Sequence, residues 1–293
     1  MPTAFATVAT DRLAYLSAGY EREMRAKRSR ALLFAGGLGV AFAASAWVVG
    51  ADPWRFFANL GAFFSYFDRV MTLDDGARVW TNVAEWFWGL RKWAGLLFDT
   101  LLIAYLGTLF GAIFGFLACF AAASNLMPNP WIRGLARRFL EFCRTVPEIV
   151  FALIFVVAFG LGPIPGVLAI AIHTTGALGK LFSEVAENID MKPVEGAISS
   201  GATWPETIRF AVVPQVLANF ASYALLRFEI NVRGAAVMGF VGAGGIGQDL
   251  IEAIRKFYYS DVSAILLLII ATVILIDLGT ERLRHALIGK EAH

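Results

Sequence analysis

The run TLLIAYLGTLFGAIFGFLACFAAA at residues 100–123 contains no charged side chain. A helix needs about 20 apolar residues to cross the hydrocarbon core of a bilayer, so this run is long enough to span one. The whole chain of 293 residues is 58% hydrophobic and 16% charged, whereas a soluble domain is nearer about 45–50% apolar and about 25% charged. The sequence therefore predicts an all-α polytopic membrane protein and argues against a disordered chain or an ordinary cytosolic enzyme.

Apolar runs along the rest of the chain predict about six transmembrane helices. They are expected at residues 31–50, 100–123, 135–161, 166–185, 212–230 and 262–278. The run Gly162-Pro163-Ile164-Pro165-Gly166 separates the third helix from the fourth and indicates a tight hairpin. The fifth helix is the weakest prediction because Arg227 and Glu229 lie near its end. Six spans place both termini on one side of the membrane.

Charged residues beside the first apolar run predict the orientation. Five cations precede it within nine residues: Arg22, Arg25, Lys27, Arg28 and Arg30. Lys and Arg are enriched on the cytoplasmic side, so residues 1–30 are expected to be a cytoplasmic N-terminal segment and both termini to be cytoplasmic. A cleaved signal peptide is the alternative, but the apolar run is long for one.

Residues 31–97 combine the first helix with an external region rich in tryptophan. Five of the eight tryptophans lie between residues 51 and 97: Trp54, Trp80, Trp86, Trp88 and Trp93. Indole rings favour the membrane interface, so Arg78–Leu97 is expected to be an amphipathic helix at the outer surface. Simple anchoring is the plainer role, and docking of a partner protein is the alternative.

Small residues recur at four-residue spacing in the second predicted helix, at Gly107, Gly111 and Gly115. This stripe lets another helix backbone approach closely. It predicts helix packing, with a dimer seam as one form of it. The two cysteines, Cys119 and Cys143, are expected to be packing residues.

A second glycine run, GAGGIG at residues 242–247, matches a dinucleotide-binding pattern only in its letters. That site needs a preceding strand and an acidic residue about 20 positions further on, and here a predicted membrane helix precedes the run. Irregular backbone at membrane depth is tolerated where it is buried in protein or lines a cavity. We therefore expect a gate or pathway-lining bend involving Gly242, Gly244, Gly245 and Gly247, with a flexible surface loop as the alternative.

Residues 190–214 form an unusually ordered internal loop. Asp190 is a plausible N-cap, Pro193 suits a first helical turn, and Gly201 suits a helix stop. Thr203 and Glu206 have the spacing of a capping box that opens a second helix. The sequence predicts a short helix–turn–helix on the cytoplasmic face.

This loop resembles the cytoplasmic signature of the permeases of binding-protein-dependent ABC importers. That signature is Glu-Ala-Ala, three residues, Gly, nine residues, Ile, one residue and Leu-Pro. The matching positions here are Glu195, Ala197, Gly201 and Pro214, while Gly196, Ala211 and Val213 depart from it. The resemblance implies a type I permease architecture, with cytoplasmic coupling helices that dock on an ATP-binding subunit.

Further stretches resemble phosphonate permeases of the methionine-type branch. They are RTVPEIV at 144–150, HTTGALGK at 173–180, ENID at 187–190 and the run at 241–247. The resemblance covers about 98–290, a core permease domain. It implies a transporter subunit of the bacterial plasma membrane that carries phosphonate or phosphate-type oxyanions, with another small solute such as an amino acid as the alternative.

The implied partners are a second copy of the chain, two ATP-binding subunits that hold ATP and Mg, and an external substrate-binding protein. No ATPase or metal motif occurs in this chain, so no catalytic residue, cofactor or metal is expected on it. The net charge of +2 without a basic stripe gives no indication of nucleic-acid binding.

Charged residues in or beside the spans are candidates for an anion pathway. Arg227 and Arg233 are the stronger candidates, and Arg144 and His173 the weaker ones. The plainer interpretation is ion pairing, of Arg227 with Glu229 and of Arg144 with Glu148. An ATP-independent channel or secondary transporter and a membrane enzyme are the rival classes, but neither accounts for the capped loop at 190–214.

Overall fold

The structure, a computed structural model, describes the backbone of residues 3–288; residues 1–2 and 289–293 lie outside that range. The described chain is helical, and its only β-type pairing is an isolated bridge between Thr72 and Arg78. The chain divides into two compact units, Met1–Tyr66 and Phe67–His293. The prediction of an all-α protein is confirmed.

The first unit consists mainly of α1 (Thr3–Val49) and α2 (Pro53–Ala58). α1 is one uninterrupted helix, and its part Gly19–Val49 is long and apolar enough to cross a membrane. The helix therefore includes residues 31–49 of the predicted first span and also the basic residues before it. α2 begins at a proline, and the Oδ1 atom of Asp52 accepts the backbone N–H of Trp54 at 3.0 Å.

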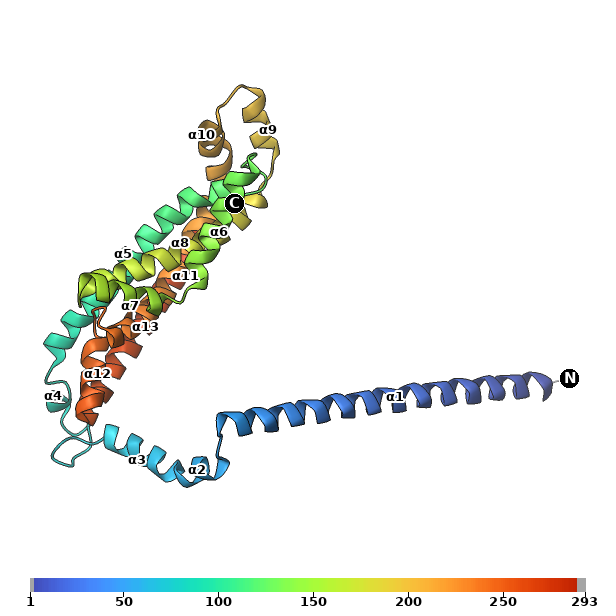
Figure 1. The fold of residues 1–293 in the computed structure, drawn as a ribbon, viewed down its shortest axis with the longest axis horizontal. Helices are drawn as coiled ribbons and strands as arrows, with labels where there is room; N and C mark the ends of the chain where they lie inside the picture. Colours follow the sequence, from blue (N-terminus) through green and yellow to red (C-terminus); the bar gives the residue numbers. More distant parts are fainter. Residues whose placement is uncertain (1–2, 289–293) are drawn as a thin grey trace. The chain divides into compact units, whose positions relative to one another are not determined.

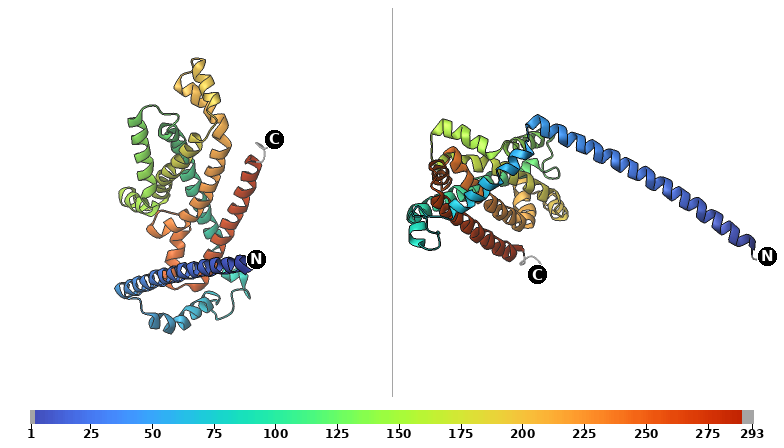
Figure 2. Two further views of the ribbon diagram at one scale, coloured as in Figure 1. Left: turned by 90° about the vertical axis from the view of Figure 1, so that its right-hand side faces the viewer. Right: turned by 90° about the horizontal axis from the view of Figure 1, so that it is seen from below.

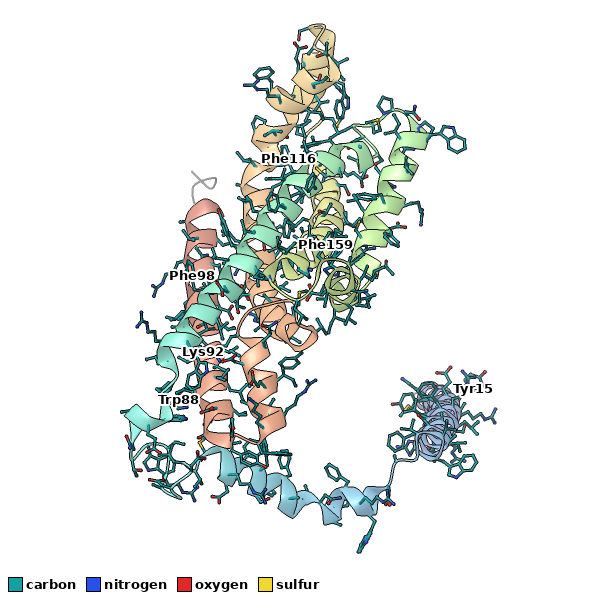
Figure 3. All side chains as sticks on the ribbon, turned by 60° about the vertical axis from the view of Figure 1, so that its left-hand side comes forward. Tyr15, Trp88, Lys92, Phe98, Phe116 and Phe159 are labelled. Atoms are coloured by element: carbon teal, nitrogen blue, oxygen red, sulfur yellow. The ribbon has the colours of Figure 1, made fainter. Side chains whose placement is uncertain are left out.

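Four long helices run through the second unit, and each lies in a stretch long and apolar enough to span a membrane: α5 (Leu90–Ala122), α8 (Pro163–Glu187), α11 (Val213–Met238) and α13 (Tyr259–Ile288). Figure 1 shows α9 (Lys192–Ser199) and α10 (Trp204–Thr207) beyond one end of this bundle, and α12 (Gly247–Lys256) at the other. Figure 3 places Trp88 and Lys92 near the α12 end and Phe116 towards the opposite end.

The glycine stripe of α5 packs against α8 of the same chain. A Cβ atom added to Gly107 would lie 2.6 Å from Ile170 Cγ2, and one added to Gly111 would lie 2.5 Å from Thr174 Cβ. One added to Gly115 would lie 3.0 Å from a backbone nitrogen of α8. Only glycine leaves room for this approach, so the predicted close packing of this face is confirmed, with an intramolecular partner.

The third predicted span is wrong as a single continuous helix. This segment instead forms two helices, α6 (Pro130–Thr145) and α7 (Glu148–Phe159), which meet at an angle of 85°. Pro147 causes the break because its ring cannot donate a backbone hydrogen bond and disfavours helical geometry at Val146. Val146 accordingly has an extended backbone, with φ −73° and ψ 123°. The described chain thus offers five candidate spans, or six if this bent pair counts as one.

The hairpin that follows α7 lies slightly earlier than predicted. Gly160 and Gly162 have φ angles of +86° and +141°, and α8 begins at Pro163 rather than at residue 166. Proline suits this first turn because the first N–H groups of a helix have no intrahelical acceptor. Figure 2 shows α7 lying across the direction of α8.

The predicted amphipathic helix Arg78–Leu97 is also wrong. Arg78 lies in the isolated bridge, a one-turn helix α4 covers Val83–Trp86, and α5 begins only at Leu90. Two indoles of this region bind the start of α13: Trp86 Nε1 donates to the hydroxyl of Ser263, and Trp88 Nε1 donates to the carboxylate of Asp261, both at 2.9 Å. α3 (Leu60–Val70) precedes this region.

Candidate functional site

The loop at 190–214 folds as the predicted helix–turn–helix. α9 ends at Ser199, Gly201 turns the chain with a φ angle of +89°, and α10 begins at Trp204. The backbone N–H of Thr203 donates to the carboxylate of Glu206 at 2.7 Å, as the capping box requires. The cap of α9 is one residue later than expected, because Met191 occupies the N-cap and Asp190 Oδ1 accepts the N–H of Lys192 at 3.0 Å.

Contacts on the inner side of this loop tie it to the bundle. Val194 on α9 is only 2% exposed and shares a core cluster with Val212 and Phe220. The side chain of Gln215, at the start of α11, accepts the N–H of Asp190 at 3.1 Å and donates to its carbonyl at 3.2 Å. The entry and the exit of the loop are therefore fastened to each other.

A further bond joins the loop to the connection after α5. The indole N–H of Trp204 donates to the carbonyl of Leu126 at 2.8 Å. Below it, Glu187 at the end of α8 pairs with Arg137 of α6 at 2.6 Å and accepts the N–H of Ser124 at 2.7 Å. No role for these five residues was predicted from the sequence. Glu187 lies in a quoted stretch, but its partners are 50 and 63 positions away.

The predicted coupling residues fall into three groups. Glu195 and Gly196 are exposed on the outer face of α9, and nothing lies within 4 Å of a Cβ added to Gly196. Ala197 packs inward against the core cluster, and Gly201 forms the turn. Pro214 lies in the first turn of α11, directly after a π-helical segment at 208–212. The loop therefore presents one free face while its other face is held by the bundle.

The glycine run at 242–247 is a buried turn rather than a flexible surface loop. The φ angles lie between +80° and +87° at Gly242, Gly244 and Gly245. The N–H of Ile246, which is fully buried, donates to the hydroxyl of Thr100 on α5 at 2.9 Å. A Cβ on Gly247 would lie 2.1 Å from the carbonyl of Ala236. The surface-loop alternative is wrong, and a gating role stays a prediction.

Arg233 forms ion pairs that differ from those predicted for α11. It pairs with Glu229, four residues earlier on the same helix, and with Asp277 of α13 at 2.8 Å. The predicted pairing of Arg227 with Glu229 is wrong, because residues two apart on a helix do not face each other. Arg233 therefore joins α11 to α13.

Arg227 instead faces α8 and the bend between α6 and α7. Its Nη2 atom hydrogen-bonds to Nδ1 of His173 on α8. Glu148, the first residue of α7, lies 3.8 Å from the same ring nitrogen. The structure thus brings Arg227 and His173 together and adds Glu148. From the sequence, Glu148 was expected to form an ion pair with Arg144 instead.

Arg144 does not join this cluster through its side chain. It is exposed near the end of α6, and the 85° bend separates it from Glu148, so the two residues are not on consecutive turns of one helix. The predicted pairing of Arg144 with Glu148 is therefore wrong.

A neutral network lies one turn further along α11. Asn231 is fully buried and donates to the hydroxyl of Thr108 on α5 at 2.8 Å and to that of Thr174 on α8 at 2.9 Å. Asn231 thereby ties α11 to both helices of the glycine seam. No motif indicated this residue in the sequence.

Long apolar helices, a polar cluster within the candidate spans and a capped helical pair at one end together define a multi-pass membrane protein. The chain belongs to the family of binding-protein-dependent transport system inner membrane components, whose family model matches residues 107–290. The resemblance noted in the sequence is thereby confirmed.

Two relatives and one solved structure illustrate the similarity. The phosphite transport system permease protein PtxC of Stutzerimonas stutzeri is 45% identical over 65% of this chain and 70% of that protein. The phosphate-import permease protein PhnE of Mycolicibacterium smegmatis is 36% identical over 82% of this chain, which corresponds to 43% of that longer protein. An inward-facing structure of the MetNI methionine ABC transporter is similar in fold, with a TM-score of 0.58 and 19% identity over 67% of this chain and 95% of that one.

Proposed function

We propose that this chain is the membrane subunit of an ATP-driven importer of phosphonate, phosphite or phosphate-type oxyanions. Family membership supports the importer, and the names of the relatives that transport phosphite and phosphate support the cargo. The resemblance of residues 144–150 and 173–180 to phosphonate permeases agrees with them. All three cargoes are tetrahedral phosphorus oxyanions, so one kind of site serves them.

The proposed assembly contains two copies of this chain, which together enclose the pathway. Two ATP-binding subunits, which hold ATP and Mg, bind on the cytoplasmic side, and a substrate-binding protein delivers the anion from outside. The basic residues before the first span support a cytoplasmic N-terminus and, with it, a cytoplasmic position for α9 and α10. The chain itself then binds neither nucleotide nor metal, and it resides in a bacterial plasma membrane.

The observation that carries this mechanism is the way α9 is fastened. Its outer face, with Glu195 and Gly196, is free, whereas its inner face packs on the core cluster and Asp190, just before it, is bonded to Gln215 of α11. A push on the outer face by a closing ATP-binding subunit would therefore be passed directly to α11. That helix also carries Arg227 and Asn231, so the movement reaches the polar groups inside the membrane.

Co-purification with partner proteins tests the assembly. The chain would be tagged, extracted from native membranes in mild detergent and analysed by mass spectrometry, with an ATP-binding subunit and a substrate-binding protein as the expected companions. The complex in proteoliposomes should then hydrolyse ATP faster when the binding protein carries phosphite, phosphate or methylphosphonate. A chain that still purifies alone after cross-linking in the membrane would contradict the proposal.

Variants of the loop test the coupling role. Glu195→Arg reverses a charge on the free face, and Gly201→Val forces a β-branched residue into a φ of +89°, which costs roughly 1–2 kcal/mol. Both variants should lower uptake at least tenfold relative to the ATP hydrolysed. Glu252→Arg is the matched control, because Glu252 lies on α12 at the opposite end of the bundle. Coupled transport by both loop variants at the control level would exclude this docking role.

A further inference from the structure

Arg227 lies within a membrane-spanning segment without a directly bound counter-ion. In the part of the chain that the structure describes, its only hydrogen bond goes to His173, and its Nε atom is buried without a partner. No carboxylate forms an ion pair with it there. Arg233, six residues further along the helix, is by contrast neutralised by the carboxylates of Glu229 and Asp277.

Burying an unpaired charge within a membrane-spanning segment costs free energy, and such a charge is usually kept because it has a function. A guanidinium cannot lose its proton, so it requires an anion or water. His173 does not supply one: its Nδ1 accepts from Arg227, so the ring is neutral, with its hydrogen on the other nitrogen. In the part of the chain that the structure describes, the group that Arg227 contacts directly therefore carries no negative charge.

One carboxylate stands close by but remains outside ion-pairing distance. Glu148 Oε2 lies 3.8 Å from Nδ1 of His173, the same atom to which Arg227 is hydrogen-bonded. Gly234 on α11 makes room for it, since a Cβ there would lie 2.6 Å from Glu148 Oε1. The side chains of Glu148 and His173 are 28% and 19% exposed, so the cluster is accessible from the surface of the bundle.

We propose that Arg227 binds the transported oxyanion inside the membrane, and that Glu148 is an internal carboxylate that competes with it. This inference rests on the proposed function. The guanidinium offers parallel N–H donors that match two oxygens of a tetrahedral phosphorus oxyanion. His173 is a positioning residue, because its bond fixes one edge of the guanidinium and leaves Nε available.

The role of Glu148 follows from its charge and its position. When the site is empty, its carboxylate partly balances Arg227, so the cation is tolerated without cargo. When an anion is bound, the same carboxylate repels it and keeps the affinity low. A pathway needs such a site, since binding must be favourable enough for entry and weak enough for release. Glu148 begins α7 directly after the bend, so a change in the bend would change its distance from Arg227.

The test uses the complete importer with its ATP-binding subunits and binding protein, reconstituted in proteoliposomes. Uptake of phosphite, inorganic phosphate and methylphosphonate is measured together with the ATP hydrolysis that the loaded binding protein stimulates. Arg227→Gln should lower uptake at least tenfold and leave the stimulated hydrolysis within twofold of wild type, because the loop at 190–214 is unchanged. Arg227→Lys should recover part of the uptake. Arg138→Gln is the matched control, since Arg138 is exposed and pairs only locally with Glu141.

Two further variants examine the neighbours of Arg227. Glu148→Gln removes the competing charge and should tighten binding of inorganic phosphate to the permease complex, without binding protein, at least threefold. His173→Gln keeps an acceptor for Arg227 and should preserve most of the uptake, whereas His173→Leu should lose it with hydrolysis intact.

The outcomes separate this inference from the proposed function. If vesicles with the wild-type importer take up none of the three anions, the proposed cargo is wrong, and the proposed anion site is then wrong as well. If wild type transports them and Arg227→Gln transports equally well, only the anion site is wrong. A parallel loss of uptake and stimulated hydrolysis in Arg227→Gln, or unchanged phosphate binding in Glu148→Gln, would also overturn the assignment.

Discussion

The glycine seam between α5 and α8 allows a stability prediction with a built-in control. Gly111→Ala adds one methyl group, whose carbon would lie 2.5 Å from Thr174 Cβ and 3.0 Å from the carbonyl of Ala171. Carbon atoms in contact are usually about 3.5–4.0 Å apart, so the two helices must separate by about 1 Å. Such overpacking costs about 1–3 kcal/mol.

The same substitution at Gly134 isolates this steric cost. Gly134 lies in the interior of α6, is exposed, and has nothing within 4 Å of an added Cβ. Both substitutions gain the higher helix propensity of alanine, about 1 kcal/mol. The difference in the free energy of unfolding between the two variants is therefore the cost of separating α5 from α8.

Thermal unfolding in one detergent and at one scan rate measures that difference. About 2–4 °C in Tm corresponds to each kcal/mol for a domain of this size, so Gly111→Ala should melt roughly 2–12 °C below Gly134→Ala. The shift belongs in the upper part of this range if the displaced Thr174 also loses its bond from Asn231. Equal melting temperatures, or a more stable Gly111→Ala, would show that the seam is looser than described.

Two other predictions concern α11. Asn231→Ala removes two buried hydrogen bonds, each worth about 0.6–1.7 kcal/mol in a membrane, and should lower the Tm. The control Asn219→Ala, at an exposed position on the same helix, should leave the Tm unchanged. Equal Tm values for the two variants would contradict a structural role for the network. Gln215→Ala breaks both bonds to Asp190 and should speed hydrogen exchange and proteolysis across α9 with little effect on the Tm. Unchanged exchange there would mean that the core contacts of Val194 alone hold the loop.

Much of the fold could be predicted because its determinants are local. The uncharged run at 100–123 is apolar on every side, which only a lipid environment or a protein core accommodates. Gly201, Thr203 and Glu206 specify a turn and a helix start through their own backbone preferences. The structure reproduces both features, and the family model, which matches residues 107–290, covers the loop and most of the run.

The errors concern places where a local pattern was extended too far. Apolar character continues from α6 into α7, but Pro147 bends the chain there by 85°. Hydropathy does not register such a break because it sums side chains and ignores backbone geometry. The tryptophans at 78–97 indicated an interface helix, but two of their indoles bind Ser263 and Asp261, which lie more than 170 residues further on.

The pairing of charges within the spans depended on tertiary structure. Arg227 lies two residues from Glu229 in the sequence, but the rotation of α11 turns it towards His173, 54 residues away. Glu148 reaches the same place only because α7 starts after the bend and Gly234 leaves space for its carboxylate.

By itself, the sequence determined that this chain crosses a membrane, where most of its helices lie and how the loop at 190–214 folds, because hydropathy and capping act between near neighbours. The tertiary structure alone decided which helix fills the glycine stripe and which groups surround Arg227. Those contacts depend on how each helix is rotated and where it is bent, and that is set by packing between residues far apart in the chain.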